Sequence, residues 1–194
     1  MPLRFHTCDV FTDRPFAGNP LAIVLGADGL TTGQMQTLAR EFNLSETIFV
    51  QAPADPAHTA RVRIFLPNAE IPFAGHPTIG CAIHLACAAA AAGDFDREIT
   101  LEEEAGLVPV RVWRRGDAVR AEFVAPVIPH GVTDARLLPV DRLAAALGLA
   151  VAGIGFGSHQ PAIWQGGPRF IFVPLASLDA LGRANAVSRT AAAI

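Results

Sequence analysis

The sequence predicts an α+β fold in which mostly antiparallel strands surround one long apolar helix. Residues 58–66 alternate between apolar and polar side chains, which is the period of a half-buried strand. Residues 77–92 are apolar on nearly every side, which is typical of a helix that is buried on several sides. Three β-like runs follow this helix, at residues 98–103, 108–114 and 118–124. A sheet that curls around a central helix satisfies all of these observations.

The N-terminal elements are predicted to be strands with one amphipathic helix among them. Thr31 or Thr32 suits the cap of that helix, because a hydroxyl oxygen can accept a bond from a free backbone N–H group. Apolar side chains then repeat at helical spacing, and Asn43 can end the helix in the left-handed conformation. The predicted strands are residues 3–12, 21–25, 47–51 and 58–66, with loops at 13–20 and 67–75.

The central helix has local signals at both ends. Pro77 suits the first helical position, and Gly93 suits the stop, so the helix is predicted over residues 77–92. Gly116 and Asp117 mark a turn between the last two strands of this half.

Two prolines, Pro126 and Pro129, interrupt the pattern and predict a domain boundary. The boundary gives an N-terminal domain of residues 1–126 and a second domain of residues 127–194. The predicted elements of the second domain are a helix at 140–147, strands at 149–156 and 169–173, and one or two helical turns at 175–181.

Composition excludes several classes of protein. The net charge of −3 over 194 residues gives no basic surplus for nucleic-acid binding, and 51% hydrophobic residues supply ample core. The longest nearly uncharged run, residues 77–93, is too short and too rich in Ala to span a membrane. Charged residues interrupt the N-terminus, so no signal peptide is expected. Cys8, Cys81 and Cys87 have no metal-binding or disulfide spacing, and we expect a reduced, cytoplasmic protein without a metal site.

The first candidate site residue is Glu46, which follows a predicted helix end and precedes a buried strand. A carboxylate desolvated at such a junction becomes a competent proton acceptor and donor near neutral pH. The alternative is a structural glutamate, either solvated in a loop or bonded to backbone N–H groups.

The second candidate is the segment Gly75-His76-Pro77, at the predicted start of the central helix. The first turn of a helix has unpaired N–H groups and a partial positive charge, so it can bind a carboxylate or a phosphate. Gly75 allows close backbone approach, and His76 adds a second proton carrier. The alternative is a plain helix cap that binds nothing.

Four motifs occur together in the first part of the chain. They are Cys-Asp-Val-Phe-Thr at 8–12, Phe-Ala-Gly-Asn-Pro-Leu-Ala at 16–22, Asn-Leu-Ser-Glu-Thr at 43–47 and Gly-His-Pro-Thr at 75–78. In this order and spacing the sequence resembles the phenazine-biosynthesis isomerase family (PhzF-like). The resemblance implies the fold of diaminopimelate epimerase, in which each of two similar halves is a barrel-like, mostly antiparallel sheet around a central helix.

The resemblance also implies an activity, namely cofactor-independent proton transfer on a small carboxylic acid by a homodimer. Glu46 corresponds to the family's acid and base, and His76 is expected beside it as a second catalytic residue. The residues that match the substrate site are Asn19, Ser45, Gly75, Pro77 and Thr78. A racemase with two catalytic cysteines is not expected, and Cys81 and Cys87 are predicted to be packed thiols.

The second half departs from the family. The loop of the type Glu-Asp-Pro-x-Thr-Gly-Ser is missing, and the resemblance weakens after residue 125. We therefore expect one complete half plus an incomplete second half that leaves apolar surface exposed. The alternatives to catalysis are an inactive truncated member or a small-molecule binding protein, and two chains could also complete one another.

Three further features have plain structural interpretations. Glu102, Glu103 and Glu104 are predicted to form the solvated end of a strand. His84 and Cys87 stand at helical spacing, but with no third ligand in view we predict packing rather than a metal site. The glycine-rich segment 153–157 has no helix after it and does not predict a dinucleotide site.

Overall fold

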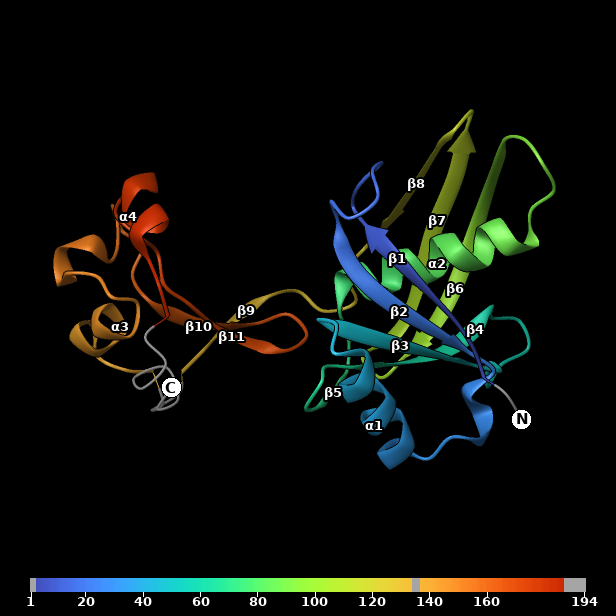
Figure 1. The fold of residues 1–194 in the computed structure, drawn as a ribbon, viewed down its shortest axis with the longest axis horizontal. Helices are drawn as coiled ribbons and strands as arrows, with labels where there is room; N and C mark the ends of the chain where they lie inside the picture. Colours follow the sequence, from blue (N-terminus) through green and yellow to red (C-terminus); the bar gives the residue numbers. More distant parts are fainter. Residues whose placement is uncertain (1–2, 134–136, 187–194) are drawn as a thin grey trace. The chain divides into compact units, whose positions relative to one another are not determined.

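An eight-stranded sheet wraps around helix α2 (Gly75–Ala89) in the first of two units of the chain (Figure 1). The computed structural model describes residues 3–133 and 137–186. The units are Met1–Val127 and Ile128–Ile194. The strands of the first unit are β1 (Arg4–Val10), β2 (Asn19–Leu25), β3 (Glu46–Gln51), β4 (Ala60–Phe65), β5 (Glu70–Ile71), β6 (Phe95–Glu103), β7 (Gly106–Arg115) and β8 (Ala118–Phe123).

The sheet runs in the order β1-β2-β3-β4-β6-β7-β8, and β5 pairs with β4 at the side. Strands β2 and β3 are parallel, as are β4 and β6, and the remaining pairs of this sheet are antiparallel. The predicted α+β class with mostly antiparallel strands is confirmed.

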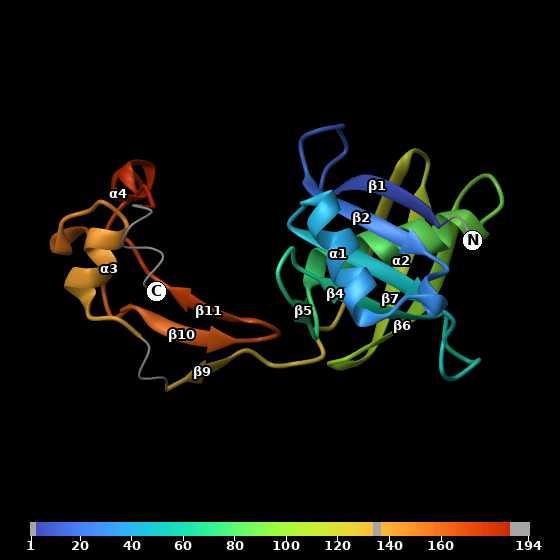
Figure 2. The same ribbon diagram turned by 60° about the horizontal axis from the view of Figure 1, so that its bottom comes forward.

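Helix α2 lies inside the curve of this sheet, between the β1–β3 side and the β6–β8 side (Figure 2). Its side chains pack into one apolar cluster with those of the surrounding strands. An apolar helix of this kind is stable only when several of its sides are removed from water. The predicted buried central helix is confirmed.

A second, smaller core lies under helix α1 (Thr32–Phe42), which packs against β3 and β4. Thr31 caps α1 by accepting from the Gln34 N–H group, and the Gln34 side chain accepts from the Thr31 N–H group in return. Asn43 ends the helix in the left-handed conformation, at φ 50°. Both predicted caps are confirmed. The buried residues of this core are Val24, Ala27, Met35, Ala39, Phe49 and Phe65, and Ala27 belongs to the short 3-10 helix η1 (Ala27–Gly29).

The predicted bounds of the central helix are wrong at both ends. Ala74 is the N-cap, so Pro77 is the third helical residue rather than the first. The missing N–H of Pro77 costs nothing there, because N–H groups of the first turn have no partner within the helix. The helix ends at Ala89, and Ala90 is already extended. The loop predicted at 67–75 also contains the short strand β5, which pairs with Ile64 and Phe65.

The run Glu102-Glu103-Glu104 is not the solvated strand end that its composition predicts. Glu103 is buried, at 8% exposure, because it continues the inward-facing positions of Ile99 and Leu101 along β6. Glu102 accepts from the Asp55 and Ala54 N–H groups in the β3–β4 loop. Those bonds, with His58, hold the Glu102 pKa at about 2.

The second unit contains a three-stranded antiparallel sheet and short helices. Its strands run in the order β11-β10-β9. The elements are β9 (His130–Val132), α3 (Val140–Ala146), the 3-10 helix η2 (Val151–Gly153), β10 (Ala162–Gln165), β11 (Arg169–Phe172) and α4 (Leu178–Arg183).

Predictions in the second unit are confirmed in part. The helix at 140–147 and the strand at 169–173 are present as α3 and β11, and α4 begins later than the predicted helical turns. The strand predicted at 149–156 is wrong. That segment forms η2 and then turns at Gly155, whose φ is 83°, so only isolated bridges form there. The sequence reasoning missed β9 and β10, which are too short to show a period.

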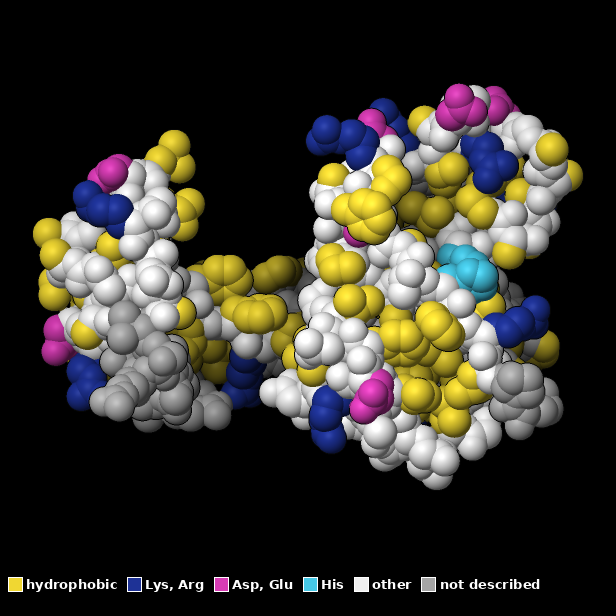
Figure 3. All heavy atoms as spheres, in the orientation of Figure 1, with side chains coloured by type: hydrophobic (Ala, Val, Ile, Leu, Met, Phe, Trp, Pro, Cys, Tyr) yellow, Lys and Arg dark blue, Asp and Glu magenta, His cyan; other side chains and the backbone are white. Residues whose placement is uncertain are grey.

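Hydrophobic side chains reach the surface of both units (Figure 3). In the second unit Trp164, Phe170 and Phe172 are exposed although all three lie on strands. None of the helices within residues 3–133 and 137–186 is long and apolar enough to cross a membrane.

Candidate functional site

Two parallel strands bring Asn19 and Ser45 together at one edge of the sheet. Leu21 on β2 stands opposite Glu46 on β3, so both strands begin at the same edge. The Ser45 hydroxyl donates to Asn19 Oδ1 at 3.0 Å. Since α1 ends at Asn43, the chain reverses there and enters β3 at Glu46. The sheet register thus fixes three of the predicted site residues relative to one another.

The first turn of α2 places His76 against Glu46. His76 Nδ1 lies 3.4 Å from Glu46 Oε2, and the two side chains are 7% and 17% exposed. Residues from the Asn-Leu-Ser-Glu-Thr and Gly-His-Pro-Thr motifs therefore meet in space. The burial of Glu46 excludes the alternative of a fully solvated loop glutamate.

Two polar atoms of this pair are buried without a hydrogen-bond partner among the described residues: Glu46 Oε2 and His76 Nε2. Buried polar atoms nearly always have hydrogen-bond partners. Two such atoms without partners therefore indicate a site where a polar group of a ligand would bind. Burial lowers the pKa of His76 below its ordinary 6.5, although the Glu46 carboxylate and the Pro20 carbonyl oppose the change. The imidazole is therefore neutral at neutral pH, with one nitrogen as donor and the other as acceptor.

Gly75, Pro77 and Thr78 share this first turn with His76 but differ in access. Gly75 is half-buried at the start of the helix, whereas Pro77 and Thr78 are buried. The Thr78 hydroxyl lies 2.8 Å from the Ala74 carbonyl and 2.6 Å from Glu103 Oε1. The Thr78 hydroxyl therefore already has hydrogen-bond partners within the protein. The substrate-binding role of Pro77 and Thr78 stays a prediction.

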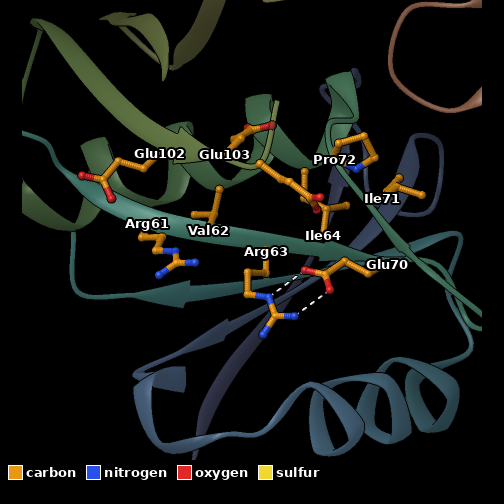
Figure 4. A pocket seen from close by; sticks show the side chains of 10 residues that line it. Arg61, Val62, Arg63, Ile64, Glu70, Ile71, Pro72, Glu102 and Glu103 are labelled. Carbon is orange, nitrogen blue, oxygen red and sulfur yellow. Dashed lines mark hydrogen bonds and ion pairs between the residues drawn. The ribbon is translucent and has the colours of Figure 1, made fainter. Parts of the chain in front are cut away.

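A pocket of about 470 Å³ lies between β4, β5 and the end of β6 (Figure 4). None of the predicted site residues lines it. Arg63, which lines it, donates two hydrogen bonds of 2.6 Å to Glu70. The opposite charges of these two residues are therefore paired with each other. We place the candidate chemistry at Glu46 and His76, where a carboxyl group and an imidazole lie together and each has a buried polar atom without a hydrogen bond.

Cys81 and Cys87 are packed thiols, as predicted, and the His84 ring packs against another histidine ring. Cys81 is fully buried in the main core, and burial raises the pKa of its thiol far above the ordinary value. Cys87 is half-buried and accepts from Arg114. The His84 ring packs against that of His6 at 4.4 Å. In the part of the chain that the structure describes, no group of three or more His, Cys, Asp or Glu could hold a metal ion.

Two glycines of α2 provide a matched pair for a stability test. A Cβ atom at Gly80 would lie 2.6 Å from Leu21 Cδ2 and 2.8 Å from Val10 Cγ2, both buried. We expect Gly80→Ala to destabilise the protein by roughly 1–3 kcal/mol through overpacking, less the ~1 kcal/mol that Ala gains in helix propensity. The shift of the urea unfolding midpoint measures the difference.

Gly75→Ala is the control for that test. A Cβ atom there would meet only Phe123, at 3.7 Å, which is ordinary contact. Its unfolding midpoint is expected to equal or exceed that of the wild type. Equal losses in the two variants would contradict the close approach of α2 to β1 and β2 at Gly80.

Most of the chain is similar to known proteins. The model of the PhzC-PhzF family, described as phenazine biosynthesis-like protein, matches residues 8–192. An uncharacterised isomerase of Mesorhizobium japonicum is 48% identical over 179 residues, which is 90% of this chain and 57% of that protein. The trans-2,3-dihydro-3-hydroxyanthranilate isomerase of Pseudomonas aeruginosa is 41% identical over 92% of this chain and 59% of its own length. The chain thus spans less than two thirds of these curated relatives.

Solved structures show the same fold. A predicted epimerase from Pseudomonas aeruginosa superposes with a TM-score of 0.80 at 32% identity, over 96% of this chain and 64% of that one. A hydroxyproline epimerase from Agrobacterium vitis, with a TM-score of 0.53 at 15% identity over 93% of this chain and 53% of that one, shares the fold alone. The expected epimerase-like fold, a curled sheet around a central helix, is confirmed.

Proposed function

Because the chain belongs to the PhzC-PhzF family of phenazine biosynthesis-like proteins, we propose that it acts as an isomerase or epimerase that moves a proton on a small carboxylic acid. Relatives that carry the word isomerase or epimerase in their names support the reaction class. One observation in the structure carries the proposal: the half-buried Glu46 lies against the buried His76, and each has one buried polar atom without a hydrogen bond among the described residues.

In the proposed step Glu46 is the acid and base. Its carboxylate takes a proton from a carbon beside an electron-withdrawing group, so the C–H electron pair stays on the substrate. The protonated Glu46 exchanges part of its acid proton with solvent and then delivers a proton to another carbon, where the new C–H bond forms with the electron pair left on the substrate. Such transfer by a positioned side chain contributes ~10²–10⁴ in rate. One carboxyl group suffices, and the step consumes no cofactor.

The start of α2 supplies partial positive charge for a negatively charged substrate. The N–H groups of Gly75 and His76 belong to the first turn, which has no partners for them within the helix. They are suited to hold the substrate carboxylate or the negative charge that develops as the proton leaves. Neutral His76 offers a donor or an acceptor beside Glu46, and Asn19 and Ser45 flank the same edge.

Proton exchange into candidate substrates tests the proposal. The protein is incubated with small unsaturated and hydroxylated carboxylic acids in deuterium oxide, and the loss of carbon-bound proton signals is followed by NMR. We expect deuterium to enter at least one acid at a carbon next to an unsaturated or carboxyl group. Binding of these acids without any exchange would contradict catalysis.

Binding without catalysis is the alternative function. It rests on the same site, because a helix start that holds a carboxylate does so whether or not a proton moves. Line broadening of an acid that never exchanges deuterium would identify a small-molecule binding protein. The homodimer, the cytoplasmic location and the domain boundary after residue 126 stay predictions, and light scattering tests the first of these.

A further inference from the structure

A buried carboxyl group, Glu103, lies beneath the first turn of α2. Its residue is 8% exposed, and it enters the interior from the last position of β6. Glu103 Oε1 lies 2.6 Å from Thr78 Oγ1, while Oε2 is buried and has no partner among the described residues. Among the described residues the side chain therefore has one hydrogen-bond partner, which lies in the turn that carries His76.

A count of hydrogens shows which form of Glu103 fits these contacts. Thr78 Oγ1 is within hydrogen-bond distance of both the Ala74 carbonyl, at 2.8 Å, and Glu103 Oε1. A hydroxyl group has one proton to donate. If Glu103 were ionised, both neighbours would be acceptors competing for that proton. If Glu103 carries its own proton, it donates to Thr78 Oγ1, and Thr78 donates to Ala74, so both contacts become hydrogen bonds.

The charges around Glu103 agree with the protonated form. Cys81 faces it from α2, and its thiol is neutral because burial raises its pKa. From β4, Arg61 and Arg63 line the same pocket as Glu103, and Arg63 is bound to Glu70 of β5. Figure 4 shows the Glu103 side chain on the side of β4 away from both arginines. Its neighbours in the sequence, Glu102 on β6 and Glu104 just after the strand, are acidic residues and supply no cation.

No cation among the described residues is within ion-pair distance of Glu103, so its charge would be buried without compensation. Burial raises the Glu103 pKa to about 7, even though the bond from Thr78 opposes the change. The carboxyl group is thus poised to lose its proton in the neutral range.

We propose that Glu103 is a positioning residue for the candidate site: as a neutral acid it donates to Thr78, which in turn donates to the Ala74 carbonyl and fixes the first turn of α2. Its effect on catalysis rests on the proposed function, because that turn carries Gly75 and His76 beside Glu46. When Glu103 loses its proton, it can no longer donate to Thr78. The Thr78 hydroxyl then donates to the Glu103 carboxylate, and the Ala74 carbonyl loses its hydrogen bond from that hydroxyl. We expect the turn to shift, and proton transfer to fall, on the alkaline side of neutrality.

Glutamine at this position mimics the neutral acid. In Glu103→Gln the amide N–H group donates to Thr78 at every pH, so both hydrogen bonds of Thr78 are kept. The exposed neighbour Glu104 gives the matched control, Glu104→Gln, which changes none of the hydrogen bonds between Glu103, Thr78 and Ala74. Thr78→Val removes the hydroxyl group that links Glu103 to the Ala74 carbonyl, and the side chain keeps nearly the same volume.

NMR without substrate tests the inference. The carboxyl carbon of Glu103, identified by its absence in Glu103→Gln, and the amides of Gly75 and His76 are followed from mildly acidic to mildly alkaline pH. We expect one shared titration step near pH 7 in the wild type and in Glu104→Gln. The amide step is expected to be lost in Glu103→Gln and in Thr78→Val. The His76 ring titrates below its ordinary 6.5, which separates the two steps.

Two results would overturn the inference. One is a Glu103 carboxyl group in the wild type that is already ionised below pH 4.5, its ordinary pKa, and this result needs no variant to fold. The other is an amide step that persists in folded Glu103→Gln. Neither depends on activity, so failure of the proposed function, seen as no deuterium exchange, is a separate result. Where exchange occurs, its alkaline decline is expected to disappear in Glu103→Gln and to persist in Glu104→Gln.

Discussion

Replacing Glu46 by glutamine is expected to reduce deuterium exchange on a bound acid by a factor of about 10²–10⁴. Glutamine has nearly the same shape as glutamate, but its amide cannot accept a proton from carbon. The Glu46 side chain lies 3.4 Å from His76 and is only 17% exposed, so water has little access to replace it as the base. The measurement is the initial rate of exchange by NMR, at equal occupancy of the site.

Glu41→Gln is the matched control for this prediction. Glu41 lies in the last turn of α1 and is exposed, so the same chemical change occurs near the site without entering it. We expect the exchange rate of that variant to equal the wild-type rate. Undiminished exchange in folded Glu46→Gln would remove Glu46 from its proposed role as acid and base.

Phe65→Ala is expected to cause the largest loss of stability, roughly 3–5 kcal/mol in the free energy of unfolding. Phe65 is 0% exposed, and its ring meets that of Phe49 edge-on at 5.4 Å in the core beneath α1. Truncation removes buried apolar surface and leaves a cavity that the neighbouring strands cannot close. Urea unfolding followed by circular dichroism measures the change.

The same substitution at Phe16 provides the control. Phe16 lies between β1 and β2 and is 98% exposed, so truncation removes almost no buried surface. We expect its free energy of unfolding to stay within about 0.5 kcal/mol of the wild type. Similar losses in the two variants would contradict the assignment of Phe65 to a closed core.

Local signals in the sequence predicted much of the first unit. Thr31 and Asn43 end α1 where expected, because helix caps depend on a few neighbouring residues. Alternation predicted β4, and unbroken apolarity predicted that α2 is interior. Short strands such as β10 were missed, because four residues show no period and pairing with β9 and β11 is what makes them strands.

Local motifs predicted which residues form the candidate site, since Glu46 follows a helix end and His76 stands at a helix start. The contact between these two side chains, the burial of Glu103 and the bonds of Glu102 to a loop all depend on the folded arrangement of distant segments. Three consecutive glutamates have no local feature that tells them apart. Their environments differ because alternate positions of a strand face opposite sides of the sheet, and α2 occupies one of those sides.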